Sequence, residues 1–193
     1  MSWTEADIPD QTGRIALVTG ANSGLGLETS RELARNGAVV VMAARNMGKA
    51  AAAKADILAD VGDARLELMT LDLADKKSIK TFADQVMAAH PTIDLLFNNA
   101  GVMATAERET ADGFELQFGT NHLGHFYLTY LLMPALLRAD AARVVTTTST
   151  ARFSAGKYDM DNPHLRGEYD PWVAYGHSKR ANLHFSMELN ERL

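Results

Sequence analysis

The sequence of 193 residues contains no cysteine, which excludes disulfide bonds and thiolate ligands for a metal ion. It has no apolar run near the roughly 20 residues that a membrane-spanning helix needs. Lysines and arginines form no basic stripe, and the net charge of −5 argues against a nucleic-acid partner. The N-terminal stretch carries Glu5, Asp7 and Asp10 in place of the positive charge of a signal peptide. From these absences we expect a cytoplasmic protein.

The chain does contain enough apolar sequence for one sizeable core, because 47% of its residues are hydrophobic. Strand-like and helix-like segments alternate along it. We expect strands at 14–19, 39–44, 66–71, 93–97 and 143–147. We expect helices at 25–36, 47–58 and 78–89, a long helical region within 111–137, and a last helix carrying Tyr175. This alternation predicts an α/β fold, with a doubly wound parallel sheet and helices on both faces.

A glycine-rich turn follows the first expected strand and reads Thr19-Gly20-Ala21-Asn22-Ser23-Gly24-Leu25-Gly26. Because a helix follows, exposed backbone amides at this turn can hold a nucleotide diphosphate. Taken alone, the glycines could equally serve tight packing or positive φ angles. The turn therefore needs a second motif before it indicates a function.

That second motif is the pair Tyr175 and Lys179. Four residues apart on a helix, the two side chains share one face, and an ammonium group below a phenol favours the ionised phenol. A tyrosine in this setting can donate or accept a proton near neutral pH. Together, the glycine turn and this pair indicate hydride chemistry on a dinucleotide.

The end of the second expected strand concerns the choice of cofactor. Nucleotide-binding folds can place a carboxylate there, against the adenosine ribose. This chain has Ala44 followed by Arg45, and a guanidinium group suits a 2′-phosphate. The sequence thus predicts a preference for NADP(H), with NAD(H) as the second choice. The alternative for Arg45 is an ordinary solvated charge.

Four motifs occur in order: TGxxxGxG from Thr19, NNAG at 98–101, a serine near the end of the fifth strand, and YxxxK from Tyr175. This set resembles that of the short-chain dehydrogenase/reductase family over residues 14–193. The stretch 121–126 (NHLGHF) and the AARN strand end are most similar to the branch of retinol dehydrogenases and protochlorophyllide reductases. The resemblance implies one Rossmann-type domain after an N-terminal extension of residues 1–13. It also implies an NADP(H)-dependent oxidoreductase for a small-molecule carbonyl or alcohol substrate, and allows a homodimer.

The resemblance implies a role for each motif residue. Tyr175 would be the general acid/base, and Lys179 would lower its pKa and bind the nicotinamide ribose. Ser149, with Thr148 as the alternative, would polarise the substrate oxygen, and Asn121 would help to hold a water that links Lys179 to solvent. The implied cofactor contacts are Gly20, Asn22, Ser23, Gly24, Leu25, Gly26, Arg45, Asp72, Leu73, Asn99, Ala100 and Gly101, with Tyr175 and Lys179.

Other hypotheses stay open. The chain could be a catalytically silent protein that senses or binds a dinucleotide, or a light-dependent reductase of the protochlorophyllide type. His122 and His125 have a spacing that metal sites use, but no carboxylate pattern completes a site, so we expect no metal and a packing or hydrogen-bonding role. In the irregular excursion at 152–172, Tyr158 and Trp172 could line a substrate pocket or anchor the loop.

The sequence ends at Leu193, after the helix of the YxxxK motif. The resemblance implies further strands and a mobile substrate loop beyond this helix. We therefore expect the chain to be C-terminally incomplete relative to the family, the alternative being a self-sufficient enzyme. The sequence does not name the substrate or the direction of the reaction.

Overall fold

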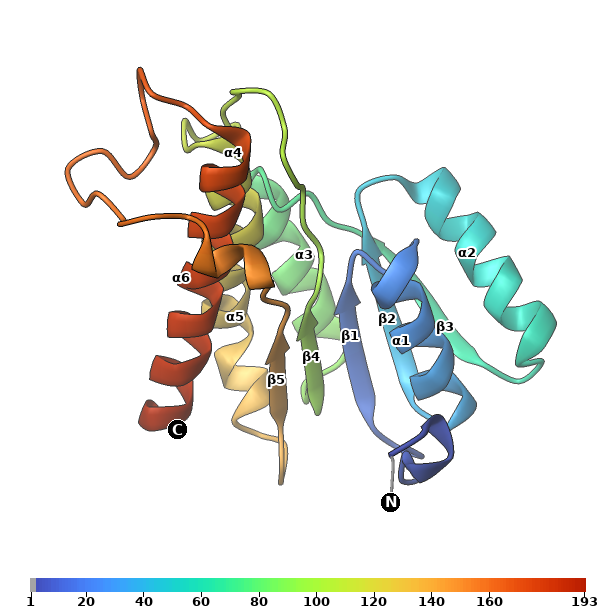
Figure 1. The fold of residues 1–193 in the computed structure, drawn as a ribbon. Helices are drawn as coiled ribbons and strands as arrows, with labels where there is room; N and C mark the ends of the chain where they lie inside the picture. The colour runs from blue at the N-terminus through green and yellow to red at the C-terminus, as the bar shows by residue number, and fades with distance from the viewer. Residues whose placement is uncertain (1–2) are drawn as a thin grey trace.

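A computed structural model describes residues 3–193 (Figure 1). Its centre is a parallel five-stranded sheet in the order β3-β2-β1-β4-β5. The strands are β1 (Ile15–Thr19), β2 (Val39–Ala44), β3 (Arg65–Thr70), β4 (Leu95–Asn98) and β5 (Arg143–Thr146). Every strand expected from the sequence is present, with ends displaced by no more than about two residues. The predicted fold class is confirmed, because all four strand pairings are parallel.

Helices cover both faces of the sheet (Figure 1). On one face lie α1 (Gly24–Arg35) and α2 (Met47–Asp60), and on the other lie α3 (Lys76–Ala89) and α5 (Gly124–Leu136). The last helix, α6 (Pro171–Arg192), packs against β5. Within residues 3–193, no helix combines the length and the apolar character that a membrane crossing requires.

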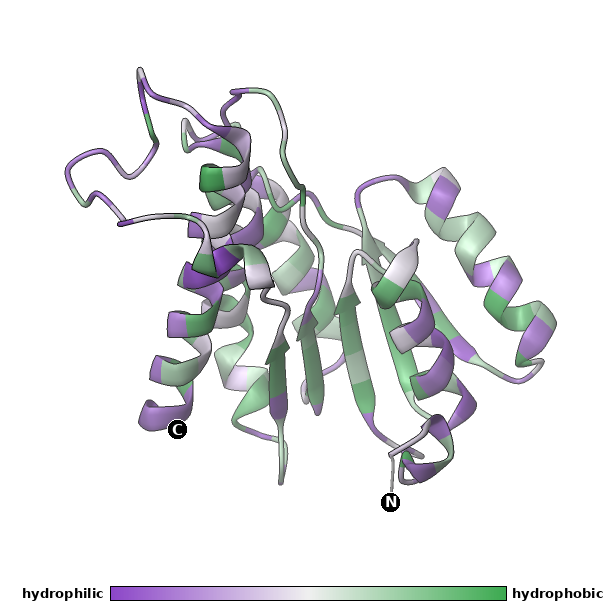
Figure 2. Ribbon diagram, viewed as in Figure 1, coloured by the Kyte–Doolittle hydropathy of each residue, from purple (hydrophilic) through white to green (hydrophobic). Residues whose placement is uncertain are grey.

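The two faces of the sheet bury two separate apolar layers. Leu17 and Leu96 pack with Phe82 of α3 and Leu128 of α5, and all four side chains are fully buried. The other layer joins the alternate strand residues to α1 and α2. Because both faces are covered, the central strands β1 and β2 are nearly continuous apolar runs, visible as green arrows in Figure 2, whereas the edge strand β3 includes Arg65 and Glu67. Each fully buried aliphatic or aromatic side chain contributes roughly 1.5–3 kcal/mol of transfer free energy.

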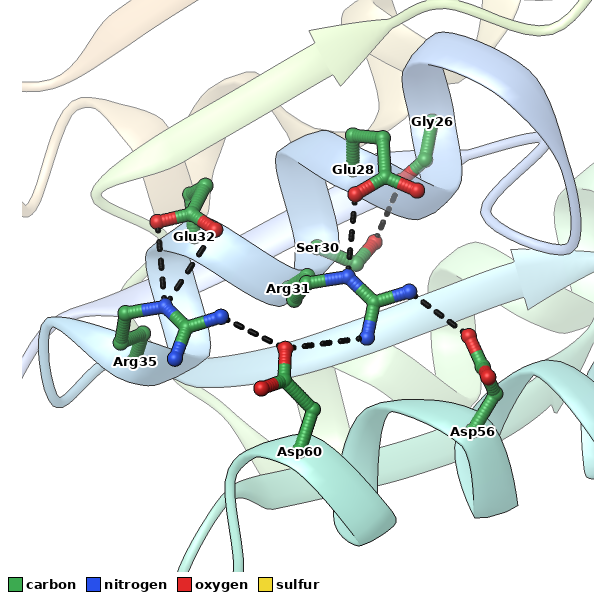
Figure 3. Close-up of polar contacts among 8 residues, drawn as sticks. All are labelled: Gly26, Glu28, Ser30, Arg31, Glu32, Arg35, Asp56 and Asp60. Carbon is green, nitrogen blue, oxygen red and sulfur yellow. Dashed lines mark hydrogen bonds and ion pairs between the residues drawn. The ribbon is translucent and has the colours of Figure 1, made fainter. Parts of the chain in front are cut away.

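An ion-pair network joins α1 to α2 (Figure 3). Arg31 donates to Glu28 at 2.9 Å and to Asp56 at 2.7 Å, while Arg35 donates to Asp60 at 2.6 Å. Asp60 also lies 3.4 Å from Arg31, so it bridges the two guanidinium groups. The hydrogen bond from Arg35 holds the pKa of the Asp60 carboxyl below its usual range. The network adds polar links between α1 and α2, which also share an apolar layer that includes Leu33 and Ile57.

The long helical region expected within 111–137 is not one continuous α-helix. It consists of α4 (Leu116–Phe118), a π-helical turn η2 (Gly119–Leu123) and α5. Gly124 packs against Leu73, where an added Cβ would lie 2.5 Å from the Leu73 carbonyl oxygen. The widened turn carries Asn121, and such turns occur frequently at functional sites.

The remaining segments are irregular. Residues 3–13 include a short turn, η1 (Glu5–Asp7), and the amide of Gln11 donates to the carbonyl of Asn36 at 2.7 Å. Residues 1–2 of the expected extension lie outside the described residues. After β5, the single turn η3 (Thr150–Phe153) leads into the predicted excursion, which ends at α6. Figure 1 shows this excursion projecting beyond the carboxyl ends of the strands.

Candidate active site

A cavity of about 350 Å³ opens at the carboxyl ends of β1, β2 and β4. This is the edge of an open α/β sheet at which ligands bind. Most of the expected cofactor residues line it: Gly20, Asn22, Ser23, Arg45, Asp72, Leu73, Asn99, Ala100 and Gly101. The other expected residues of the turn, Gly24, Leu25 and Gly26, form the first turn of α1. Segments far apart in the sequence therefore meet at one site.

The glycine turn is built by close approach. Gly20 has a φ of 68°, and an added Cβ there would lie 2.9 Å from Cα of Ala100. At Gly26 an added Cβ would collide with the carbonyl of Gly20. Ser23, at the N-cap of α1, makes no side-chain capping bond, so the first amides of this helix keep their donors for a ligand. Packing thus requires Gly20 and Gly26, and the turn that they form leaves amide donors open to an anion.

Thr19 and Asn99 join the ends of β1 and β4 beneath the cavity. The Thr19 hydroxyl oxygen accepts the amides of Asn99 at 2.9 Å and Ala100 at 3.0 Å, and the Asn99 side chain donates to the Thr19 carbonyl at 2.9 Å. These bonds fix the NNAG segment to the start of the glycine turn. Thr19 therefore joins the two segments that line the cavity on either side, the glycine turn after β1 and the NNAG segment after β4.

Arg45 and Asp72 face each other at one end of the cavity. Nη1 of Arg45 lies 3.9 Å from Oδ2 of Asp72, and the arginine side chain is 69% exposed. An exposed pair at this distance contributes little stability, so the guanidinium is free to bind an anion. The other oxygen of Asp72 accepts the amide of Ala74 at 2.9 Å, which fixes the carboxylate at the cavity wall.

Tyr175 and Lys179 lie on α6, whose first turn is capped by Asp170 and begins with Pro171. Nζ of Lys179 lies 5.8 Å from the centre of the Tyr175 ring and donates to the carbonyl of Thr147 at 3.1 Å. Burial lowers the pKa of Lys179 to about 8. Its ammonium group is therefore mostly charged at pH 7, with protons left to bind a ligand.

Ser149 and Thr148 differ in what their hydroxyl groups bind. Thr148 donates to the carbonyl of Lys179 at 2.7 Å, so its proton is already in use. The Ser149 hydroxyl accepts the amide of Ala151 at 3.2 Å, and within residues 3–193 its own proton has no acceptor. Of the two residues, Ser149 has the hydroxyl available to a substrate oxygen.

The side chain of Asn121 is buried and fully bonded. Its oxygen accepts the amide of Val102 at 2.8 Å, and its nitrogen donates to the Val102 carbonyl at 2.9 Å and to the Ser178 hydroxyl at 3.0 Å. Ser178 in turn donates to the carbonyl of Tyr175 at 2.7 Å. Asn121 thus links the NNAG segment to the turn of α6 that carries Tyr175. Because every polar atom of the side chain already has a partner, the water that the resemblance places on Asn121 would have to bind the backbone carbonyl of this residue.

Gly101 lies between the cavity and the Tyr175–Lys179 pair. It lines the cavity, and an added Cβ would lie 3.0 Å from Oδ1 of Asn121 and 3.5 Å from Nζ of Lys179. The site therefore has a floor without side chains, a guanidinium at one end and an ammonium at the other. These donors fit a dinucleotide that carries a phosphate on its adenosine ribose.

A buried polar network, not expected from the sequence, fixes the loop after Gly101. Gln117 accepts the amide of Ala104 at 2.8 Å and donates to the Tyr169 hydroxyl at 2.9 Å and the Pro171 carbonyl at 2.8 Å. Glu115, also buried, accepts the amides of Gln117 and Phe118. The sequence signal that could have indicated this network is the presence of two polar residues, Glu115 and Gln117, in an otherwise apolar helical stretch. Two of the partners of Gln117, Tyr169 and Pro171, come from the end of the excursion and could not be inferred from spacing.

The two histidines of the NHLGHF stretch bind polar partners. Nδ1 of His122 lies 3.2 Å from Oδ1 of Asn182, and Nδ1 of His125 lies 2.9 Å from the carbonyl of Asn121. No cluster of three side chains suited to a metal ion occurs in residues 3–193. Hydrogen bonding thus accounts for both histidines.

Comparison with known proteins gives one family. A model of the short chain dehydrogenase family matches residues 14–193. Mouse retinol dehydrogenase 12 is 45% identical over 190 residues, which cover 98% of this chain and 59% of the relative. The chain thus spans less than two thirds of that relative's length.

Solved structures agree with this comparison. An uncharacterized protein from Mycobacterium paratuberculosis has a TM-score of 0.89 and 46% identity, with 100% of this chain and 67% of the other covered. A short-chain dehydrogenase from Shigella flexneri complexed with NADP has a TM-score of 0.76 and 26% identity, with 96% and 74% covered.

Proposed function

The chain belongs to the short-chain dehydrogenase/reductase family, in its retinol dehydrogenase-like branch, and from this premise we propose an NADP(H)-dependent oxidoreductase. It would transfer a hydride between the nicotinamide and the carbon of a carbonyl or alcohol substrate. The observation that carries the proposal is the position of Gly101, which lines the nucleotide cavity and approaches Nζ of Lys179. The proposed cofactor and acid/base residues would thereby share one site.

The cofactor would lie along the cavity. The amides at the start of α1 would bind the diphosphate, and Arg45 would bind the 2′-phosphate. Asp72 would accept a hydrogen bond from the adenine, and Lys179 would donate to the hydroxyls of the nicotinamide ribose. When bound, NADPH supplies the hydride. The preference for NADPH over NADH is supported by Arg45 and by the absence of a carboxylate at the end of β2.

The chain's own residues would handle the substrate oxygen. Ser149 would donate a hydrogen bond to that oxygen, which favours charge on it as the carbon is reduced. Tyr175 would give its proton to the same oxygen, and the Lys179 ammonium would stabilise the tyrosine anion that remains. A proton from solvent then restores the phenol, and oxidation of an alcohol follows the same steps in reverse.

The test begins with a titration of the protein with NADPH, followed by turnover against a panel of aldehydes and ketones. The panel includes retinal, because a relative is named retinol dehydrogenase. We expect NADPH consumption with at least one carbonyl compound, and a Tyr175→Phe variant that binds NADPH as the parent does but shows less than about a hundredth of its turnover. Binding without turnover across the panel, in the parent protein, would favour a silent dinucleotide-binding protein.

Two further parts of the proposal concern the protein's setting. A homodimer can be tested by light scattering of the NADPH-bound protein. Location in the cytoplasm can be tested by fractionation of cells that express the natural gene.

A further inference from the structure

Arg180 follows Lys179 on α6 and donates to the loop that carries Ser149. Its Nη2 and Nε donate to the carbonyl of Arg152 at 2.6 and 3.2 Å, and its Nη1 donates to the carbonyl of Gly156 at 2.6 Å. Within residues 3–193, no carboxylate lies in ion-pair distance of Arg180. The guanidinium group therefore binds the backbone of the 152–156 segment. Because the donor is charged, these hydrogen bonds are stronger than bonds between neutral groups.

The segment held by Arg180 is continuous with Ser149. Ser149 is the N-cap of η3, and Nη1 of Arg152 donates to the Ser149 carbonyl at 2.9 Å. The loop also lies directly on α6, because an added Cβ at Gly176 would come within 2.6 Å of the Ala151 carbonyl oxygen. The turn that begins at Ser149 thus contacts α6 at two positions, Gly176 before Lys179 and Arg180 after it.

The loop needs an external tie for two physical reasons. A 3₁₀ turn of four residues has poor hydrogen-bond geometry and little stability of its own. Beyond Gly156, whose φ is 62°, the chain continues into a long irregular excursion with no helix or strand before α6. A catalytic group must stay within about 0.5 Å of its productive position.

We propose that Arg180 is a positioning residue that holds the Ser149 hydroxyl at a fixed place relative to Tyr175. The proposal rests on the function proposed above for Ser149. Arg180 touches neither substrate nor cofactor in this scheme. It fixes both oxygen-binding groups to one helix, since Tyr175 lies on α6 and Ser149 is tied to it.

The test is a double-mutant cycle of Arg180→Met and Ser149→Ala. The quantity compared is kcat, measured at saturating NADPH and saturating carbonyl substrate. We expect Arg180→Met to lower kcat by about ten- to a hundredfold, because a misplaced catalytic group costs that much, with the Kd for NADPH unchanged within about twofold. In the Ser149→Ala background, the same change should lower kcat by less than about twofold. Equal losses in the two backgrounds, or a parallel loss of NADPH affinity, would overturn the proposal.

The matched control is Arg192→Met, on the same helix. Among residues 3–193, Arg192 donates only to Glu188, one turn away, so its loss should leave kcat unchanged. If Arg180→Met fails to fold, Arg180→Lys keeps the charge and the apolar stem but cannot bind both carbonyls in the fork geometry of arginine. The lysine variant should show an intermediate kcat, and a kcat equal to that of the parent would contradict the role.

Amide hydrogen exchange separates a failure of this proposal from a failure of the proposed function. In Arg180→Met, the amides of residues 151–156 should exchange at least about tenfold faster, while the rest of α6 stays as protected as in Arg192→Met. If exchange in this segment is unchanged, Arg180 does not hold the loop, and the proposal fails whether or not the protein is active. Suppose that residues 151–156 exchange faster in Arg180→Met but the parent protein reduces no carbonyl compound. Arg180 then holds the loop as proposed, and the proposed oxidoreductase function is contradicted.

Discussion

The hydroxyl oxygen of Thr19 lies 2.9 Å from Nε2 of His125, where the end of β1 meets the start of α5. The other ring nitrogen of His125 lies 2.9 Å from the carbonyl of Asn121, which can only accept. His125 therefore carries its proton on Nδ1, and its Nε2 is an acceptor for the Thr19 hydroxyl, whose single proton also has the Phe97 carbonyl oxygen at 3.1 Å. The glycine turn, the NNAG segment and the π-helical turn are thus joined by one neutral imidazole.

This contact predicts a loss of stability in acid. Burial lowers the pKa of His125 to about 4, below its unfolded value of 6.5, so the unfolded chain binds more protons between these values. The free energy of unfolding should fall as pH drops from about 6.5 to 4, by at most about 3 kcal/mol from this residue. His125→Gln keeps an acceptor for Thr19 and removes the titrating group.

Urea unfolding at pH 7 and at pH 4.5 checks this prediction. The drop in unfolding free energy between the two pH values should be smaller in His125→Gln than in the parent. Burial also lowers the pKa of His122, so His122→Gln is the matched comparison at a less buried site. An identical drop in the parent and in His125→Gln would show that His125 does not titrate in this range.

Arg45 should determine the choice between the two cofactors. Removing the guanidinium in Arg45→Ala takes away a charge-assisted contact to the 2′-phosphate, so NADPH affinity should fall by about 1–3 kcal/mol while NADH affinity stays the same. Fluorescence titration with each cofactor measures both. Arg138→Ala removes another exposed arginine, bonded to the Pro91 carbonyl, and should change neither affinity. Equal binding of NADPH and NADH by the unmodified protein would contradict the assignment.

The strands and the glycine turn could be predicted because their signals are local. A short apolar run such as 39–44 is typical of a strand buried on both faces, and Gly26 is required by a contact with Gly20 inside the same turn. The facing of Tyr175 and Lys179 follows from helix geometry alone. Their catalytic roles remain predictions, since they depend on a substrate.

The π-helical turn and the loop contacts could not be predicted. One extra residue in a turn leaves the hydrophobic pattern of 111–137 almost unchanged, and Gly124, which follows the turn, packs against Leu73 from another segment. The bonds of Arg180 and Gln117 likewise reach residues whose positions depend on the excursion. A sequence pattern identifies such side chains as polar but does not identify their partners.

Strain at Ala104 gives a prediction for stability. Its φ of 48° lies in the left-handed region, where a side chain is unfavourable, and the bond from its amide to Gln117 holds it there. Ala104→Gly should therefore raise the free energy of unfolding by about 0.5–1 kcal/mol. Ala106→Gly, in the same loop but without a positive φ, should lower it, because glycine adds freedom to the unfolded chain. Urea unfolding of the two variants decides, and destabilisation by Ala104→Gly would rule out strain at this position.

The pKa of Lys179 sets a limit on cofactor binding in alkaline solution. Burial lowers this pKa to about 8 in the free protein, so the ammonium group loses its proton as pH rises through that value. If the charged form donates to the nicotinamide ribose, the Kd for NADPH should be constant between pH 6 and 7 and should rise above pH 8, by at most about tenfold per pH unit. The sign follows from deprotonation, which removes a charge and a donor from the site.

Lys179→Met tests the origin of this pH dependence. The variant should bind NADPH more weakly at pH 7 and should lose the rise in Kd above pH 8, because no group at that position titrates. Lys77→Met, at an exposed position on α3, is the matched control and should keep the dependence of the parent. Isothermal titration at half-unit steps from pH 6 to 9 gives the three curves. A rise in Kd that persists unchanged in Lys179→Met would assign the titrating group to another residue and would remove Lys179 from the binding of the ribose.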